Sequence, residues 1–218
     1  MSRLQKLCES ENIPLNMEMA ATDEMLAIAL DFYKKSFDIE VKALGDNHPS
    51  IANAYNNMAN VFFKQGENDK ALAAARHSIQ LNRNFAEGYA ILAEAAVYGG
   101  DLEEAREAIQ HAKRLHPHYP VRFDWIEAHV LLQLGDTQTA RALLETTVEE
   151  APGFAAAFVL LAVTYAELGE DERGKSVLAA LRGQQPGFQV EEFVASAPFA
   201  FEDRRQRLNH ALMTLISD

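Results

Sequence analysis

The sequence predicts an all-α solenoid, which is a row of antiparallel helix pairs that share one continuous core. Glycines recur about every 34 residues, at Gly66, Gly100, Gly135 and Gly169. An alanine stands seven residues before each glycine, and another small residue stands five residues after it. A repeat of this length with helical periodicity is typical of stacked helix–turn–helix units, whose core is continuous whatever the chain length.

The first helix of each unit is predicted from the spacing of its apolar residues. In residues 53–65, Tyr55, Met58, Ala59 and Phe62 are spaced i, i+3, i+4 and i+7, which places them on one face of a helix. The same spacing returns in the second and fourth units. A glycine then ends each helix, because glycine tolerates the left-handed conformation that a helix end often needs.

The second helix of each unit follows the glycine directly. Asp101 and Asp136 stand at favourable N-cap positions, and Asp101 with Glu104 fits a capping box. Small residues on both helices allow them to approach to about 8–9 Å. These residues are Ala59, Ala93, Ala128 and Ala162 in the first helices, and Ala71, Ala105, Ala140 and Gly174 in the second. Because glycine is a poor helix former, Gly174 is expected to weaken the fourth unit by up to ~1 kcal/mol.

Three parts of the chain depart from the pattern. The third unit is one residue longer than its neighbours, and the shifted positions of Trp125 and Val130 predict an irregularity in its first helix. Pro14 interrupts the place of a first helix upstream, so residues 1–21 are expected to form an irregular cap. In the tail, Pro198 breaks the repeat, and an apolar stripe over residues 208–216 predicts a final helix that caps the array.

The combined pattern of an aromatic, a hydrophobic residue, alanine, a second aromatic, glycine, alanine and proline resembles the tetratricopeptide repeat. The prolines are Pro117, Pro152 and Pro186, each two residues before a closing aromatic. The resemblance implies a right-handed α–α superhelix in a single domain, residues 1–218. Its units are expected at residues 52–85, 86–119, 120–154 and 155–188, with a partial N-terminal repeat or cap at 1–51 and a C-terminal cap at 189–218. A 42-residue spacing from Ala29 to Ala71 resembles the longer repeat of kinesin light chains, whereas the later units resemble bacterial arrays.

Composition narrows the choice of partner. The net charge is −12, and residues 1–109 alone hold 17 acidic and 10 basic side chains, so no basic half exists to attract nucleic acid or an anionic membrane. A basic or mixed-charge peptide is a better electrostatic match. Cys8 is the only cysteine, which excludes an intramolecular disulfide, and no signal-peptide-like apolar run opens the chain. We expect a cytoplasmic protein without a membrane segment.

One motif suggests an enzyme. Residues 169–176 read GEDERGKS, which matches the phosphate-binding formula G-x4-G-K-S. That chemistry needs a strand before the loop, but the preceding residues have helical periodicity, and three carboxylates in the loop would repel a triphosphate. His111, His116 and His118 cluster at a turn without a paired glutamate, which favours exposed histidines over a metal site. We therefore predict no catalytic residues, no metal and no cofactor, and keep nucleotide binding at Gly169–Ser176 as a remote alternative.

The resemblance implies that the first helix of each unit lines an inner groove. In the first unit the groove positions carry Asn53, Asn56, Asn57, Asn60 and Lys64. A row of amides buries no apolar area, but each amide donates and accepts hydrogen bonds, which suits the backbone of a bound peptide. Kinesin-light-chain-like repeats also carry asparagine at two of these positions. The alternative interpretation is a solvated helix face.

The same groove positions become apolar further along the chain, at Ile91, Trp125, Ile126, Val159 and Val163. Exposed apolar patches mark interfaces, and tryptophan is a favoured anchor. A partner's helix or peptide, a second copy of the chain or the chain's own tail would each fill such a patch, and Trp125 is also compatible with the core. A carboxylate clamp of the chaperone-binding type is disfavoured, because only Arg122 fits it.

These observations predict a non-catalytic adaptor that binds a peptide or amphipathic helix of a partner protein in its groove. The alternative is a self-associating scaffold that forms a homo-oligomer through the groove or the C-terminal helix.

Overall fold

The computed structural model describes residues 23–190, 192, 206, 210–213 and 215. Within these residues every regular element is an α-helix. The helices are α2 (Asp23–Leu44), α3 (Ile51–Lys64), α4 (Asn68–Leu81), α5 (Ala86–Gly99), α6 (Leu102–Leu115), α7 (Arg122–Leu134), α8 (Thr137–Glu150), α9 (Ala155–Glu167) and α10 (Asp171–Gln184).

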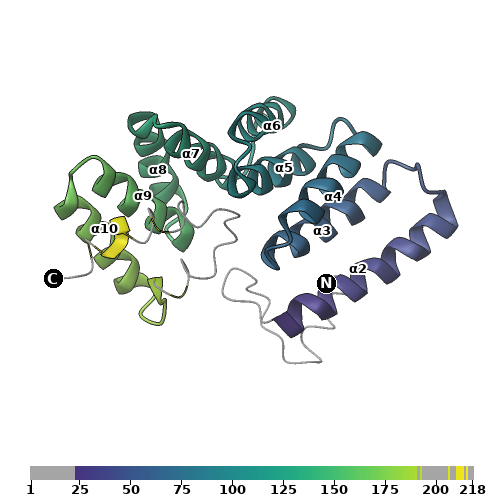
Figure 1. Ribbon diagram of the computed structural model, residues 1–218, viewed down its shortest axis with the longest axis horizontal. Coiled ribbons are helices and arrows are strands. Elements are labelled where there is room, and N and C mark those ends of the chain that lie inside the picture. The colour runs from purple at the N-terminus through teal and green to yellow at the C-terminus, as the bar shows by residue number, and fades with distance from the viewer. Residues whose placement is uncertain (1–22, 191, 193–205, 207–209, 214, 216–218) are drawn as a thin grey trace.

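Consecutive helices pair into four hairpins, α3 with α4, α5 with α6, α7 with α8 and α9 with α10. The hairpins follow one another along an arch, from α2 at one end to α10 at the other (Figure 1). Each hairpin packs on the next, since the second helix of one contacts the first helix of the following one. The predicted all-α solenoid is confirmed.

The turns within the hairpins are made by the predicted glycines. Gly66, Gly100, Gly135 and Gly169 all have positive φ, between 72° and 89°. The residue after each glycine donates its backbone N–H to a carbonyl five residues earlier, as in Asp101 N to Ala96 O at 3.0 Å. This is the bond of a Schellman motif, which satisfies an end carbonyl of the helix.

The predicted N-caps are also present, although the capping box is not. Asp101 accepts a hydrogen bond from Glu104 N at 3.1 Å, and Asp136 accepts one from Thr139 N at 3.3 Å. The Glu104 carboxylate instead accepts two hydrogen bonds from Arg76 on α4, at 2.9 and 2.6 Å. It therefore links one hairpin to the next rather than closing its own helix end.

The small residues at the helix crossings are fully buried, as close packing requires. Gly174 differs from its alanine counterparts for a structural reason. A Cβ atom added there would lie 2.9 and 3.0 Å from the methyl groups of Leu215 and 3.1 Å from the carbonyl oxygen of Ala162. Glycine therefore makes room for Leu215, a contribution that helix propensity alone does not capture.

The irregularity predicted in the first helix of the third unit is absent, and that prediction is wrong. Residues 122–134 form an unbroken α-helix, α7. The extra length lies in the turn before it, which spans residues 116–121, whereas the equivalent turns span residues 82–85 and 151–154. Proline lacks a backbone N–H, and Pro117 and Pro120 keep this turn from joining either helix.

At the C-terminal end, Leu212 and Leu215 are buried and join the core of the fourth unit. The expected irregular cap over residues 1–21, the break at Pro198 and the predicted N-terminal part of the final helix lie outside the described residues.

Candidate binding surface

The inner side of the arch is formed by the first helices of the hairpins. Helices α3, α5, α7 and α9 lie next to one another there, each contacting the next (Figure 1). Side chains that point to this side from different repeats therefore form one continuous surface, as the resemblance implies.

Four asparagines lie on one side of helix α3, and we call this side the amide face (Asn53, Asn56, Asn57 and Asn60). Asn53 is exposed, and the other three are partly exposed, as is Lys64 one turn further on. The apolar side chains of the helix, including Met58 and Ala59, are buried on its remaining sides. The Oδ1 atom of Asn56 is buried and has no hydrogen-bond partner. The structure thus brings the predicted polar residues together on one helix face.

The first helices of the next two hairpins, α5 and α7, carry acidic and basic groups that form ion pairs. Arg122, at the start of α7, is ion-paired with Glu94 of α5, and its guanidinium lies 3.9 Å from Glu87. Glu94 is buried in spite of its charge. A buried carboxylate needs such a partner, because an uncompensated charge out of water is costly. Arg122 is therefore paired within the protein.

The apolar residues predicted for the groove are core residues in the described structure. Ile91, Ile126, Val159 and Val163 are at most 2% exposed, and Trp125 is 7% exposed. The expectation that they form an exposed patch is wrong. The physical reason is that α5 and α9 are apolar on nearly all sides, which is typical of a helix buried all round, and that α7 lies between α5 and α9.

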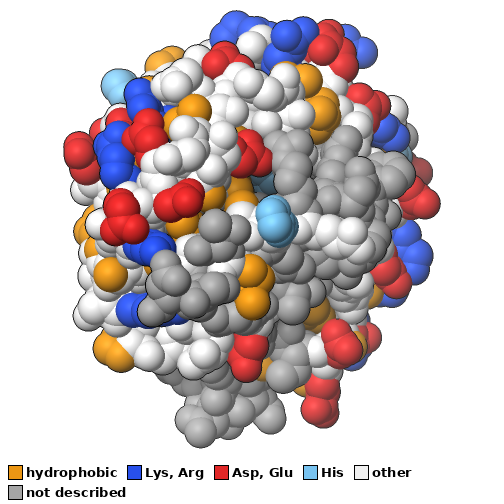
Figure 2. All heavy atoms as spheres, turned by 60° about the vertical axis from the view of Figure 1, so that its left-hand side comes forward, with side chains coloured by type: hydrophobic (Ala, Val, Ile, Leu, Met, Phe, Trp, Pro, Cys, Tyr) orange, Lys and Arg blue, Asp and Glu red, His pale blue; other side chains and the backbone are white. Residues whose placement is uncertain are grey.

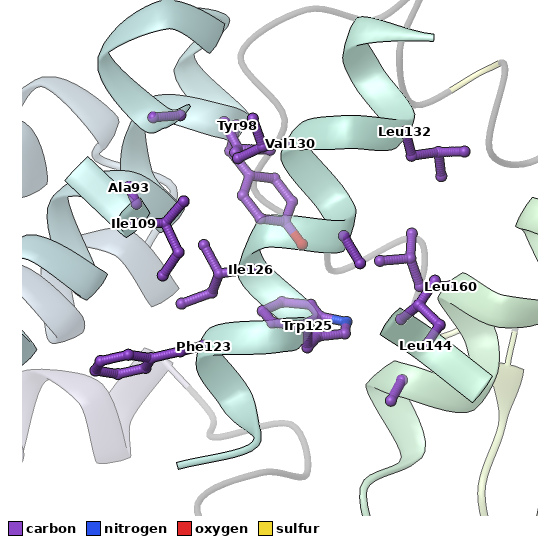
Figure 3. Packing of buried hydrophobic residues seen from close by; sticks show 14 of the residues in the cluster. Ala93, Tyr98, Ile109, Phe123, Trp125, Ile126, Val130, Leu132, Leu144 and Leu160 are labelled. Carbon is purple, nitrogen blue, oxygen red and sulfur yellow. The ribbon is translucent and has the colours of Figure 1, made fainter. Parts of the chain in front are cut away.

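The surroundings of α7 show how these side chains are covered. Phe123 and Ile126 point toward Ile109, whereas Trp125 points to the other side of the helix, toward Leu144 and Leu160 (Figure 3). The Trp125 ring lies 5.6 Å from that of Phe154, the residue that precedes α9. Trp125 therefore packs between the third and fourth hairpins. Its indole Nε1 is buried without a hydrogen-bond partner.

A row of rings crosses the repeats behind this surface, and the sequence patterns did not single it out. Phe63 contacts Tyr98 at 5.1 Å, Tyr98 contacts His129 at 5.0 Å, and His129 contacts Trp125 at 5.9 Å. Burial, with the nearby Glu94 carboxylate as a second cause, raises the pKa of Tyr98. The one available signal was that Phe63 stands three residues, and Tyr98 two residues, before a turn glycine.

The segment that matches the phosphate-binding formula forms a hairpin turn followed by the first residues of α10. Helix α9 precedes it and α10 begins at Asp171, so most of the segment is helical. Gly174 lies inside α10, and Lys175 lies 3.4 Å from Glu172. A phosphate-binding loop needs free backbone N–H groups that follow a strand, and this geometry does not supply them.

The remaining candidates from the sequence are the histidine cluster and a membrane segment. In the part of the chain that the structure describes, no group of three or more histidine, cysteine or acidic residues could hold a metal ion. His116 and His118 are exposed, while the His111 ring lies 4.3 Å from that of Tyr89. None of the helices described is long and apolar enough to cross a membrane. Basic and acidic side chains are intermixed around the face shown in Figure 2.

A row of helix hairpins with small residues at each crossing defines a helical-repeat protein of the kind that binds other proteins. Three family profiles, each described as tetratricopeptide repeat, match residues 18–84, 56–120 and 131–196. The chain belongs to the tetratricopeptide repeat family.

Solved structures agree on the fold. TTC0263, a thermophilic TPR protein of Thermus thermophilus, is 22% identical with a TM-score of 0.62, over 87% of this chain and 92% of that one. YrrB, described as a TPR protein with an unusual peptide-binding site, is 21% identical with a TM-score of 0.54, over 83% and 91%. A Podosopora anserina kinesin light chain with nearly identical TPR-like repeats is 18% identical with a TM-score of 0.58, over 85% and 97%. A search of curated proteins gives no significant match.

Proposed function

We propose that this protein is a non-catalytic adaptor that binds an extended segment of a partner protein along the inner side of its arch, with the amide face of α3 as the contact. The observation that carries the proposal is the alignment of four asparagines on one side of α3, whereas α5 and α9 are largely apolar. Asparagine is a poor helix former, so four asparagines lower the stability of this helix, and a role in binding would account for their presence.

Hydrogen-bonding chemistry supports an extended peptide as the ligand. Each amide donates and accepts, and an extended backbone offers N–H and C=O groups in turn. Asn53 is exposed and Asn57 and Asn60 are partly exposed, so their amides are accessible to such a backbone.

Charge and burial narrow the partner further. The chain carries a net charge of −12, which favours a basic or mixed-charge segment. An amphipathic helix would need apolar contacts, but Ile91, Trp125, Ile126, Val159 and Val163 are buried. An extended segment is therefore a better fit than a helix. YrrB, which has a similar fold, is described as having a peptide-binding site, so peptide binding is compatible with this fold. Cytoplasmic location stays a prediction.

The test is affinity capture with three immobilised proteins, followed by titration calorimetry with a peptide from the captured partner. The proteins are the parent, the double variant Asn57→Ala/Asn60→Ala and the control Asn84→Ala. Asn84 is an exposed asparagine in the turn after α4, outside the amide face. Losing two amide hydrogen bonds should weaken binding on the order of tenfold or more.

The expected result is that the parent and the Asn84 variant capture the same partner with equal affinity, whereas the double variant binds weakly at an unchanged melting temperature. Equal binding by all three proteins would refute the amide face as the contact. The non-catalytic part of the proposal predicts that calorimetry with ATP and magnesium gives no heat for the parent or for Lys175→Ala.

A further inference from the structure

Helix α2 differs in its packing from α4, α6 and α8, the second helices of the first three hairpins. Helices α4, α6 and α8 each lie between two first-position helices, whereas the main packing of α2 among the described helices is against α3. Its 22 residues make it about 33 Å long, at 1.5 Å per residue. The side of α2 near α3 carries the buried Leu26 and the partly buried Leu30, Tyr33 and Phe37.

The opposite side of α2 is a surface that we call the outer face (Glu24, Ile28, Asp31, Phe32, Lys35, Ile39 and Lys42). Ile28 is 47% exposed and Ile39 is 67% exposed. They are eleven residues apart, which is about three helical turns, so both point the same way. Of the five large hydrophobic side chains that are exposed in the described structure, three belong to α2, the third being Leu44.

The charges on the outer face are arranged symmetrically about its middle. Glu24 lies in the first turn of α2 and Lys42 in the last. Between them Asp31 and Lys35 form an ion pair of 2.5 Å. Glu24 and Asp31 therefore lie toward the N-terminus of this face, and Lys35 and Lys42 lie toward its C-terminus, with the exposed Asp38 at its edge.

We propose that the outer face of α2 binds the outer face of a second copy of this chain, with the two helices antiparallel. In this register Ile28 of each copy lies opposite Ile39 of the other, so that both apolar residues are covered. Glu24 of each copy lies near Lys42 of the other, and the two Asp31–Lys35 pairs meet at the centre. Such a contact is isologous and closes as a dimer without leaving a free end.

A second copy fits this face better than an unrelated partner does. A self-complementary pattern is a requirement of an antiparallel pair of identical helices, and each of the three elements here satisfies it: the isoleucines, the outer charges and the central ion pair. Helix α2 lies at one end of the arch (Figure 1), and its outer face is separate from the amide face, which belongs to α3. A dimer through α2 would present two amide faces, so a partner with two binding segments would gain affinity through avidity.

Sedimentation equilibrium over a wide concentration range tests the association. The weight-average mass of the parent should rise from 24.2 kDa toward twice that value as concentration increases. Ile39→Asp should remain at the monomer mass at every concentration, because a carboxylate replaces the apolar contact. Leu134→Asp is the matched control, since Leu134 is 45% exposed at the end of α7, and it should associate as the parent does.

Charge exchange tests the register. Lys42→Glu should weaken the association at low ionic strength, and Glu24→Lys/Lys42→Glu should restore it, because the exchanged charges again face each other. Chemical cross-linking adds a direct measure in a Cys8→Ser background. A short bismaleimide should link Ile28→Cys chains to Ile39→Cys chains in a mixture, but neither variant to itself, because identical positions would lie about 16 Å apart along the pair.

The proposal is overturned if the parent stays monomeric at all concentrations, as it would if another part of the chain or a different protein covered this face. It is also overturned if Ile39→Asp associates like the parent, or if each cysteine variant links to itself. None of these results bears on the amide face, whose test depends on partner capture.

Discussion

Gly174 shows how one residue serves two neighbouring parts of the structure. Its column requires a small side chain because α9 and α10 cross there, and Leu215 then occupies the space that an alanine methyl group would fill. From the sequence alone, Gly174 is a weakness, since glycine lowers helix stability. That expectation could not include Leu215, because a contact between residues 41 positions apart leaves no periodic signal.

Gly174→Ala is therefore expected to destabilise the protein by about 1–2 kcal/mol, since the overpacking cost exceeds the helix-propensity gain of ~1 kcal/mol. In a Leu215→Ala background the cost should fall by ~1 kcal/mol or more, because the crowding methyl groups are gone. Urea unfolding of the four proteins in this cycle measures the difference. An equal cost in both backgrounds would show that Leu215 does not restrict the site.

Tyr165 gives a second prediction at this scale, in the alkaline range. Burial, followed by a 2.6 Å hydrogen bond that its hydroxyl donates to Glu145, raises the pKa of Tyr165 to about 12. An unfolded tyrosine ionises near pH ~10. Because the folded pKa is the higher one, the stabilisation is complete below about pH 10 and is lost as pH rises toward 12.

The free energy of unfolding of the parent should therefore exceed that of Tyr165→Phe at about pH 8, and the gap should narrow above about pH 10. Denaturant unfolding of both proteins at several pH values checks this. A gap that stays constant over the whole alkaline range would mean that the Tyr165 hydroxyl titrates alike in the folded and unfolded states.

At the scale of the helices, ion pairs connect one hairpin to the next, and their burial separates strong links from weak ones. Arg76 and Glu104 join α4 to α6 at the surface, whereas Arg122 joins α7 to the buried Glu94 of α5. Exposed pairs contribute about 0.2–1 kcal/mol. Removing one partner of a buried pair costs more, because the other charge stays uncompensated.

Arg122→Leu should thus destabilise the protein by about 2 kcal/mol or more, whereas the matched change Arg76→Leu should cost less than about 1 kcal/mol. Arg122→Leu/Glu94→Gln should recover much of the loss, because the buried charge is then gone. Thermal and urea unfolding measure all three variants. If Arg122→Leu and Arg76→Leu cost the same, the Glu94 carboxylate is effectively solvated.

The sequence predicted much at this scale and failed in identifiable places. Turn glycines, N-cap aspartates and crossing alanines act within one helix or between adjacent helices, so their spacing along the sequence was sufficient to predict the hairpins. The prediction for the third unit was wrong because an extra residue inside a helix and an extra residue in the turn before it change the sequence spacing in the same way. The prediction that Trp125 and its apolar neighbours are exposed was wrong, because periodicity shows which residues share a helix face but not what covers that face.

At the scale of the whole molecule, the structure is a helical scaffold on which we propose a binding surface of few residues. The fold follows from the repeat, and the family is shown by three profile matches. The amide face is a local exception to that repeat, because its asparagines add no apolar area to the core. Such an exception suits binding, and the spread of acidic charge favours a basic or mixed-charge segment over nucleic acid.

Amide NMR of the asparagine side chains tests this account most directly. On titration with a peptide from the captured partner, we predict that the side-chain NH2 signals of Asn53, Asn56, Asn57 and Asn60 shift together and saturate at one affinity, while that of Asn84 stays in place. Saturable shifts confined to the outer helices α4, α6 and α8, with the amide-face signals unmoved, would contradict it.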